Sequence, residues 1–293
     1  MFTQAIEIVA KFTRAIHSIG RYYGSTRIHP GTATLFFVNS DGWALTCGHV
    51  ANQLAAEGVI NQNAEAFRNE LSARSGSKKG KRLLKELEKK YGYSKKTVFE
   101  LHNRFVGCVQ GKGTVEVIKH KEVDAALIKF HGYSRLRCDT FPVFPSDTSS
   151  LQQGKFLCRL GFPFPEFTNF KYDEENDQIV WTDTGRRTTP RFPIEGMLTR
   201  RLGKGRDIIG FEMSTPGLRG QSGGPAFDID GKVWGMQFQT AHHDLNFDID
   251  QKVMRGHIEK PVTDIPFFHT GLCVHIDVLK SFMKEHDVQF TEA

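Results

Sequence analysis

A six-residue stretch at 220–225, with the sequence Gly-Gln-Ser-Gly-Gly-Pro, restricts the local fold more than any other part of this chain. A helix does not readily start here, because the two glycines cost backbone entropy and the proline removes a donor and clashes with the preceding turn. The stretch therefore fits poorly to a serine on a sharp strand-to-helix elbow. It favours a loop that turns the backbone N–H groups of Gly220 and Ser222 toward a common point. Two such donors together stabilise the oxyanion that forms when a serine attacks a carbonyl. The alternative is a glycine-rich turn that carries an incidental serine.

His49 is a candidate general base for Ser222. Residues 32–38 are β-branched and aromatic, the turn signal Asn-Ser-Asp-Gly follows at 39–42, and residues 43–46 return, which predicts a β-hairpin. His49 comes soon after this hairpin, where a strand end can hold a base at the rim of a barrel. A histidine that only caps or packs is the alternative.

Asp124 is the candidate partner of that base. It opens a nearly continuous apolar segment that ends at Phe130, which predicts a strand and places the carboxylate near the core. An isolated carboxylate is costly there unless it accepts hydrogen bonds or pairs with a charge, and an imidazole N–H satisfies that need. A turn-forming aspartate is the alternative, and Glu122 and Asp139 are rivals for the role.

The composition is that of a soluble globular protein large enough for two domains. The chain has 293 residues, of which 39% are hydrophobic and 25% charged. No apolar run approaches the roughly 20 residues that span a bilayer, and Glu7, Lys11 and Arg14 interrupt the N-terminal stretch where a secretory signal is apolar. The five cysteines are an odd number without a Cys-x-x-Cys pair, which predicts a reducing compartment, the cytoplasm, rather than a disulfide framework.

Helical spacing of apolar residues predicts an N-terminal helix over Ala5–Ile19 and a C-terminal helix over Ile276–His286.

Between the candidate base and its partner, residues 61–105 read as two short helices with twelve Lys/Arg and five Glu, a net charge of +7 against +6 for the whole chain. This basic insert is interpreted either as a solvated helical hairpin or as a docking surface for an acidic partner, a protein or a nucleic acid.

Three motifs, at 46–50 (Thr-Cys-Gly-His-Val), 124–127 (Asp-Ala-Ala-Leu) and 220–225, resemble the catalytic motifs of trypsin/chymotrypsin-like serine proteases and stand in that family's order. The stretch 219–236 resembles the disulfide-free branch that includes the high-temperature-requirement proteases. The resemblance covers roughly 31–60 and 105–285. It implies an all-β fold of two six-stranded antiparallel β-barrels of chymotrypsin type, with an N-terminal helix, a helical insert and a C-terminal helix.

The expected domains follow from this resemblance. They are an N-terminal helix at 1–25, a first β-barrel at 26–145 that contains the basic insert 61–105, and a second β-barrel with the C-terminal helix at 146–293.

Gln221 departs from secreted members of the family, which carry an acidic residue at this position that captures the N-terminus freed on activation. The 71 residues after Ser222 are too few for the rest of a barrel and a PDZ domain, so a stand-alone protease domain is expected.

The resemblance implies a serine endopeptidase that forms an acyl-enzyme. Ser222 would attack the scissile carbonyl, His49 would take and return its proton, and Asp124 would orient the imidazole. The backbone N–H groups of Gly220 and Ser222 would form the oxyanion hole. No metal and no organic cofactor are needed, and the expected partner is a protein or peptide substrate, not a membrane.

The resemblance also implies where the substrate side chain would bind. Pro216 stands where trypsin-like members carry the aspartate that selects Lys or Arg. Gln237, Phe238 and Gln239 would form one wall of the pocket, with Cys273 near its far side. We therefore predict specificity that is not trypsin-like, for an uncharged, apolar or small residue before the cut.

Functions of another class remain open at this point. One is a protease fold that has become a binding or regulatory module, with the three groups present but not aligned. The other is a protein that docks nucleic acid or an acidic protein through the basic insert, although the insert lacks aromatic interleaving and a nucleic-acid motif.

Overall fold

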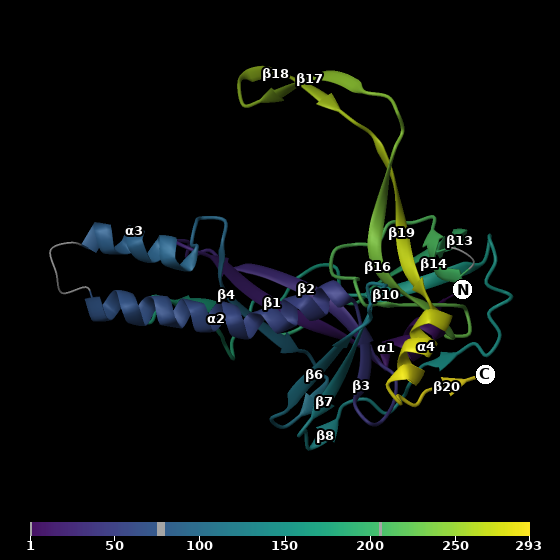
Figure 1. Ribbon diagram of the computed structural model, residues 1–293. Coiled ribbons are helices and arrows are strands. Elements are labelled where there is room, and N and C mark those ends of the chain that lie inside the picture. Colours follow the sequence, from purple (N-terminus) through teal and green to yellow (C-terminus); the bar gives the residue numbers. More distant parts are fainter. Residues whose placement is uncertain (1, 75–79, 205–206) are drawn as a thin grey trace.

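The computed structural model describes residues 2–74, 80–204 and 207–293 (Figure 1). Two antiparallel β-structures form the body of the protein. The first is a six-stranded sheet, whose strands in spatial order are β4 (Val98–Phe105), β1 (Thr13–Tyr22), β2 (His29–Phe37), β3 (Trp43–Thr46), β7 (Ala126–His131) and β6 (Thr114–Lys119). The second is a closed six-stranded barrel of β10 (Phe156–Gly161), β13 (Phe192–Lys204), β14 (Asp207–Met213), β19 (Phe267–His275), β16 (Val233–Asp244) and β15 (Pro225–Phe227).

The remaining elements decorate these two bodies. The helices are α1 (Thr3–Ala10), α2 (Gly48–Arg74), α3 (Gly80–Tyr91) and α4 (Ile276–Glu285). Small strand pairs are β5 (Val109–Gln110) with β8 (Arg135–Leu136), β11 (Phe170–Asp173) with β12 (Gln178–Trp181), β17 (Ile249–Arg255) with β18 (Ile258–Asp264), and β9 (Val143–Phe144) in parallel with β20 (Thr291–Glu292). No helix in the described ranges is both long and apolar enough to cross a membrane.

The all-β double-barrel prediction is confirmed, with one difference in the first barrel. Its six strands curve into a half-barrel, and no ladder between the described strands closes β4 onto β6, whereas the second barrel is closed. The helical insert fills part of that opening, because α2 packs along β4 and also contacts β6.

The N-terminal helix is shorter than predicted. α1 ends at Ala10, and Thr13–Tyr22 forms β1, so the predicted helix over Ala5–Ile19 is wrong in its second half, and the segment 1–25 is not helical throughout. β1 pairs with both β2 and β4 and is buried along most of its length. A strand covered on both faces shows no alternation, and here its apolar residues happened to fall at helical spacing.

The insert also differs in extent from the predicted 61–105. α2 starts at Gly48, directly after β3, and runs without a break to Arg74, while the last predicted insert residues, 98–105, are strand β4 of the first sheet. The two helices project from the body as an antiparallel pair (Figure 1). A small apolar cluster joins them to each other and to the first sheet, and it is composed of Ala64, Phe67, Leu83 and Leu87 of the helices and Phe99 of β4.

A second projection was not predicted. β16 and β19 run on beyond the barrel as a two-stranded arm that ends in the β17–β18 hairpin (Figure 1). The arm carries large apolar side chains that are exposed, namely Leu245, Phe247, Ile249, Met254, Ile258, Ile265, Phe267 and Phe268.

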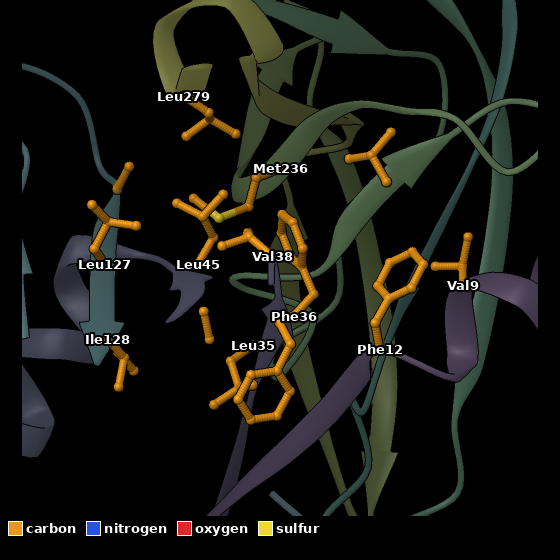
Figure 2. Close-up of a cluster of buried hydrophobic side chains, with 14 of the residues drawn as sticks. Val9, Phe12, Leu35, Phe36, Val38, Leu45, Leu127, Ile128, Met236 and Leu279 are labelled. Atoms are coloured by element: carbon orange, nitrogen blue, oxygen red, sulfur yellow. The ribbon is translucent and has the colours of Figure 1, made fainter. Parts of the chain in front are cut away.

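One hydrophobic core joins both bodies and fixes their relative placement. Figure 2 shows Leu45 and Leu127 of the first sheet beside Met236 of β16 and Leu279 of α4. All four side chains are fully buried. Because β3 and β7 meet β16 through this core, the ends of these strands are held together, and the candidate site lies at those ends.

Candidate active site

His49 and Asp124 are brought together by strand pairing. β3 and β7 are antiparallel neighbours with Thr46 opposite Ala126. The residues that follow β3 and those that precede β7 therefore meet at the same end of the two strands. The Nδ1 atom of His49 lies 2.6 Å from Oδ2 of Asp124, and the backbone N–H of His49 donates to Oδ1 at 2.8 Å. An ionised carboxylate only accepts hydrogen bonds, so this contact places the imidazole proton on Nδ1 and leaves Nε2 free to accept a proton.

The surroundings of Asp124 keep its carboxylate charged. Burial acts to raise the pKa of Asp124, but the hydrogen bonds from the side chain and backbone of His49 and from Gly48 outweigh burial, so the pKa lies below its ordinary value. The carboxylate also sits at the N-terminus of α2, where free N–H groups and the helix dipole favour negative charge. Gly48 allows this approach, since a Cβ there would lie 3.0 Å from Oδ1 of Asp124.

The rival carboxylates lie elsewhere. Asp139 accepts a hydrogen bond from Thr140 Oγ1. Glu122 is exposed, and its negative charge acts on His120. Asp124 is therefore the carboxylate that the fold delivers to His49.

Ser222 lies in the loop between β14 and β15, and this loop is fastened to the first sheet. The backbone N–H of Thr34 donates to Ser222 O at 2.9 Å, and Thr34 Oγ1 donates to Gly220 O at 2.7 Å. Gly220 has φ +100° and Gly223 has φ +87°, conformations that side chains with a Cβ rarely adopt. The glycines of the motif thus serve a tight loop, as predicted, rather than a helix start.

The backbone N–H groups of Gly220 and Ser222 donate no hydrogen bond to any residue in the described part of the chain. Their neighbours are engaged, because Gln221 N–H donates to Leu218 O at 2.9 Å and Gly224 N–H donates to Gln221 O at 2.8 Å. Two unused donors on either side of an otherwise hydrogen-bonded turn are what an oxyanion hole requires.

His49 and Ser222 line the same pocket, which has a volume of about 390 Å³ and is also bordered by Gly220, Arg219 and Pro163. The His49 side chain is 52% exposed and that of Asp124 29%, so the pair is open to a substrate. Ser222 Oγ makes no hydrogen bond with the described residues, including His49. Catalytic hydrogen bonds are often long without substrate and tighten when it binds.

Gln221 takes a structural position in the loop. Its side chain is fully buried, its Oε1 accepts from the Leu218 N–H at 3.0 Å, and its Nε2 donates to Phe192 O at 3.1 Å. The buried amide thus stabilises the turn through two hydrogen bonds to uncharged backbone groups.

The residues expected to form the specificity pocket lie close together, and Arg159, which the sequence did not point to, lies among them. Gln237 and Cys273 are fully buried, with Cys273 Sγ 3.7 Å from Gln237 Oε1, and Gln237 Nε2 donates to Gln239 O at 2.6 Å. Phe238 is half-buried against the main core. Arg159 of β10 connects them, since it donates to Pro216 O and to the Gln237 side chain. The feature of the sequence that could have pointed to Arg159 is the presence of an arginine inside the apolar segment 156–161.

A metal is a weaker fit to these residues than a general-base pair. Ligand atoms of Cys47, His49 and Asp124 lie within 4.8 Å of one another. However, burial, together with the charge of Asp124, raises the pKa of the Cys47 thiol well above its ordinary value, and the thiolate form is the one that binds a metal. Cys47 Sγ instead contacts Gln237 O at 3.2 Å.

Two barrel-like sheets that carry a hydrogen-bonded His–Asp pair and a serine loop on one pocket are the arrangement known from chymotrypsin-type serine proteases. A protein-family model described as the trypsin-like peptidase domain matches residues 31–236, well over half of the chain, and this range contains His49, Asp124 and Ser222. The chain belongs to the trypsin-like peptidase family.

Similarity to individual proteins is more distant. Among solved structures, a variant of the HtrA-type protease AlgW with a tripeptide aligns with 97% of this chain and 62% of that chain, at 9% sequence identity and a TM-score of 0.47. This chain thus spans less than two thirds of the length of that protease. No curated protein matches the sequence.

Proposed function

We propose that this protein is an endopeptidase that cleaves peptide bonds with Ser222, His49 and Asp124 through an acyl-enzyme. The observation that carries the proposal is the hydrogen-bonded His49–Asp124 pair on the same pocket as Ser222, beside the two unused N–H donors of the Ser222 loop. Serine, base, orienting carboxylate and oxyanion donors together are the parts that acyl transfer needs.

In this proposal each group has a defined step. Nε2 of His49 accepts the hydroxyl proton as Ser222 Oγ attacks the scissile carbonyl, and the imidazolium then gives that proton to the leaving amine. Asp124 keeps the other proton on Nδ1 and stabilises the cation. The N–H groups of Gly220 and Ser222 stabilise the oxyanion, and a water molecule activated by His49 hydrolyses the acyl-enzyme.

Labelling with a fluorophosphonate probe tests the proposal directly. The purified protein should react at one serine, and peptide mapping should place the adduct on Ser222. The Ser222→Ala variant should not react. A folded wild-type protein that neither reacts nor cleaves any peptide would instead be a protease-fold binding module, which was the alternative from the sequence.

The proposal includes specificity that is not trypsin-like. Pro216 carries no charge where trypsin-like members have the selecting aspartate, and Gln237 and Gln239 line the region with neutral amides. A substrate lysine or arginine would find no counterion there, so cleavage should not require a basic residue before the scissile bond.

A second proposal concerns the basic insert, which we propose docks an acidic partner. It rests on the cations of α3. Lys81, Arg82, Lys85 and Lys89 are exposed and form no ion pair with the described residues. Lys78 and Lys79, which belong to the same predicted cluster, lie outside the described residues. Other charges of the insert are already paired, since Lys90 contacts Glu70.

Neutralising Lys81, Arg82, Lys85 and Lys89 to glutamine should weaken binding to a polyanion such as heparin and flatten its salt dependence, because electrostatic attraction between exposed charges is screened by salt. The kcat/KM for a short peptide should stay within about twofold, since surface changes of this kind have small effects on stability. An equal loss of short-peptide turnover would make the insert a structural element. Unchanged polyanion binding would remove the docking proposal.

A cytoplasmic, reducing setting is also part of the proposal. The five cysteines are free thiols and all are buried, namely Cys47, Cys108, Cys138, Cys158 and Cys273. Burial raises the pKa of Cys158 and Cys273 to about 12, which protects them from oxidation. Alkylation of the denatured, unreduced protein should therefore modify five thiols by mass spectrometry, and a native cross-link would argue against a reducing setting.

A further inference from the structure

Arg159 is the largest fully buried side chain among the described residues. It points from β10 between two segments that flank the Ser222 loop. Its Nη2 donates to Thr215 O at 2.9 Å, to Thr215 Oγ1 at 2.7 Å and to Pro216 O at 3.1 Å, and its Nη1 donates to Gln237 Oε1. The guanidinium is thus fixed at the base of the region assigned to the substrate side chain.

Within the described part of the chain, no acidic side chain balances the charge of this guanidinium. Arg159 forms no ion pair with the described residues, and its Nε has no hydrogen-bond partner there. Arg21 provides the contrast, because it is equally inaccessible but is paired with Glu100 and Asp177. A buried cation held only by neutral groups is costly. A buried charge without a counterion, next to a candidate site, is a feature of functional sites, where the ligand can supply the missing charge.

Gln237 links Arg159 to the candidate nucleophile. The backbone N–H of Gly223 donates to Gln237 O, and Gln237 N–H donates to Gly224 O, each at 2.9 Å, so Gln237 lies beside the two residues that follow Ser222. The side chain of the same residue binds Arg159. Gln237 therefore lies between the guanidinium and the Ser222 loop and contacts both.

Two glycines make room for this arrangement. A Cβ at Gly271 would lie 1.8 Å from Arg159 Nη1, so only glycine lets the guanidinium lie flat against β19. A Cβ at Gly217 would lie 2.2 Å from Gln237 Nε2, so the Gln237 amide fills the space between the walls of the pocket. Thr240 Oγ1 donates to Gly217 O at 2.5 Å across the same gap. The space above Arg159 is thus occupied by a carboxamide of the protein itself.

We propose that Arg159 sets the substrate specificity and selects an acidic residue before the scissile bond. The carboxylate of that residue takes the place of the Gln237 amide as acceptor of the Arg159 Nη1 hydrogen bond, and the amide moves aside. This inference rests on the proposed endopeptidase function. It departs from the uncharged residue that the sequence predicts, because nothing in the sequence brings Arg159 of β10 to Pro216 and Gln237.

The chemistry sets the order of preference. A carboxylate satisfies both the charge and the hydrogen bonds of Arg159, whereas an apolar side chain removes the Gln237 acceptor and leaves the guanidinium unpaired. A substrate lysine would bring like charges together in a dry pocket. The expected ranking is an acidic residue first, glutamine next, then apolar residues, with basic residues last.

The test is the binding of product-type peptides to the full-length Ser222→Ala variant by calorimetry. The probes are N-acetyl-Ala-Ala-Glu and the matched peptides that end in Gln, Leu or Lys, so the terminal carboxylate is the same in all four. We expect the Glu peptide to bind about 10- to 100-fold more tightly than the Leu peptide, as for hydrogen bonds to a buried charge. Equal or tighter binding of the Leu or Lys peptide overturns the proposal.

A pair of arginine variants locates the selecting charge. Arg159→Gln, made in the Ser222→Ala background, should abolish the preference for Glu. Arg219→Gln is the matched control, because Arg219 is an exposed arginine on the same pocket as Ser222. The preference should survive this change, and a preference that follows Arg219 overturns the proposal. If Arg159→Gln does not fold, the four-peptide ranking and the Arg219→Gln variant still decide the question.

Failure of this inference can be told apart from failure of the proposed function. The binding measurement uses a chain without the serine hydroxyl, so its result stands whether or not the wild-type protein cleaves peptides. Wild-type labelling at Ser222 with a Leu-preferring profile keeps the endopeptidase and removes the role of Arg159. Glu-selective binding without labelling keeps the role of Arg159 and removes the endopeptidase.

Discussion

Replacing Ser222 with alanine is expected to lower kcat for peptide hydrolysis by about 10⁴- to 10⁶-fold, the range seen when a serine nucleophile is removed from such a triad. The reason is chemical, because no other hydroxyl of the loop at 220–225 can form the acyl-enzyme. KM should change little, since the walls of the pocket are untouched. Folding should be unaffected, because Ser222 Oγ has no hydrogen-bond partner in the described part of the chain.

Hydrolysis of a chromogenic peptide, followed together with the melting temperature, checks this result. Ser150→Ala is the matched control, since Ser150 is an exposed serine in the loop before β10. It should retain full activity. Wild-type turnover by folded Ser222→Ala would show that the serine has been misassigned.

The candidate site was predictable because its residues belong to short local motifs. The hairpin that precedes His49 and the apolar strand that follows Asp124 are both visible in the sequence, and pairing of β3 with β7 brings the two residues together. The glycines at 220 and 223 mark a loop for reasons of backbone conformation alone. Each motif is thus local, and only the meeting of His49 with Asp124 depends on a distant part of the chain, through the pairing of β3 with β7.

Arg159 shows the opposite case. Its neighbours in sequence indicate only a buried strand, and an arginine in such a strand has no defined partner until the fold is known. The acceptors that hold it come from residues 215–216 and from β16, more than 50 positions away. A cluster of contacts that three separate segments build is therefore not readable from one of them.

The errors in the fold have equally physical causes. β1 was assigned to a helix because a strand buried between β2 and β4 loses the alternation that marks strands. The β17–β18 hairpin was missed because nearly all of its side chains are exposed, so it has no buried face to create a pattern. In both cases the burial pattern lacks the alternation by which a strand is recognised in a sequence.

Replacing Asp124 with asparagine is expected to lower kcat at neutral pH by about 10⁴-fold, as in other triads of this kind. The size and shape of the side chain are kept, so the contact with the His49 backbone can persist. An amide can donate a hydrogen bond to Nδ1, which places the imidazole proton on Nε2, the atom that must accept a proton from Ser222. The substitution also removes the negative charge that stabilises the imidazolium.

Kinetics of short-peptide hydrolysis at pH 7 would measure this effect, and Asp139→Asn supplies a matched control. Asp139 is an exposed carboxylate in the same half of the protein, whose contact is with Thr140, and it was a rival candidate in the sequence. Its substitution should leave kcat within about twofold, because surface substitutions away from such contacts have small effects. The loss in Asp124→Asn should appear in kcat with the melting temperature nearly maintained, because the geometry is kept and only the tautomer and charge change. If Asp139→Asn were the damaging variant, or if Asp124→Asn kept full turnover, then the hydrogen bond between Asp124 and His49 would be structural and the base would be oriented by another group.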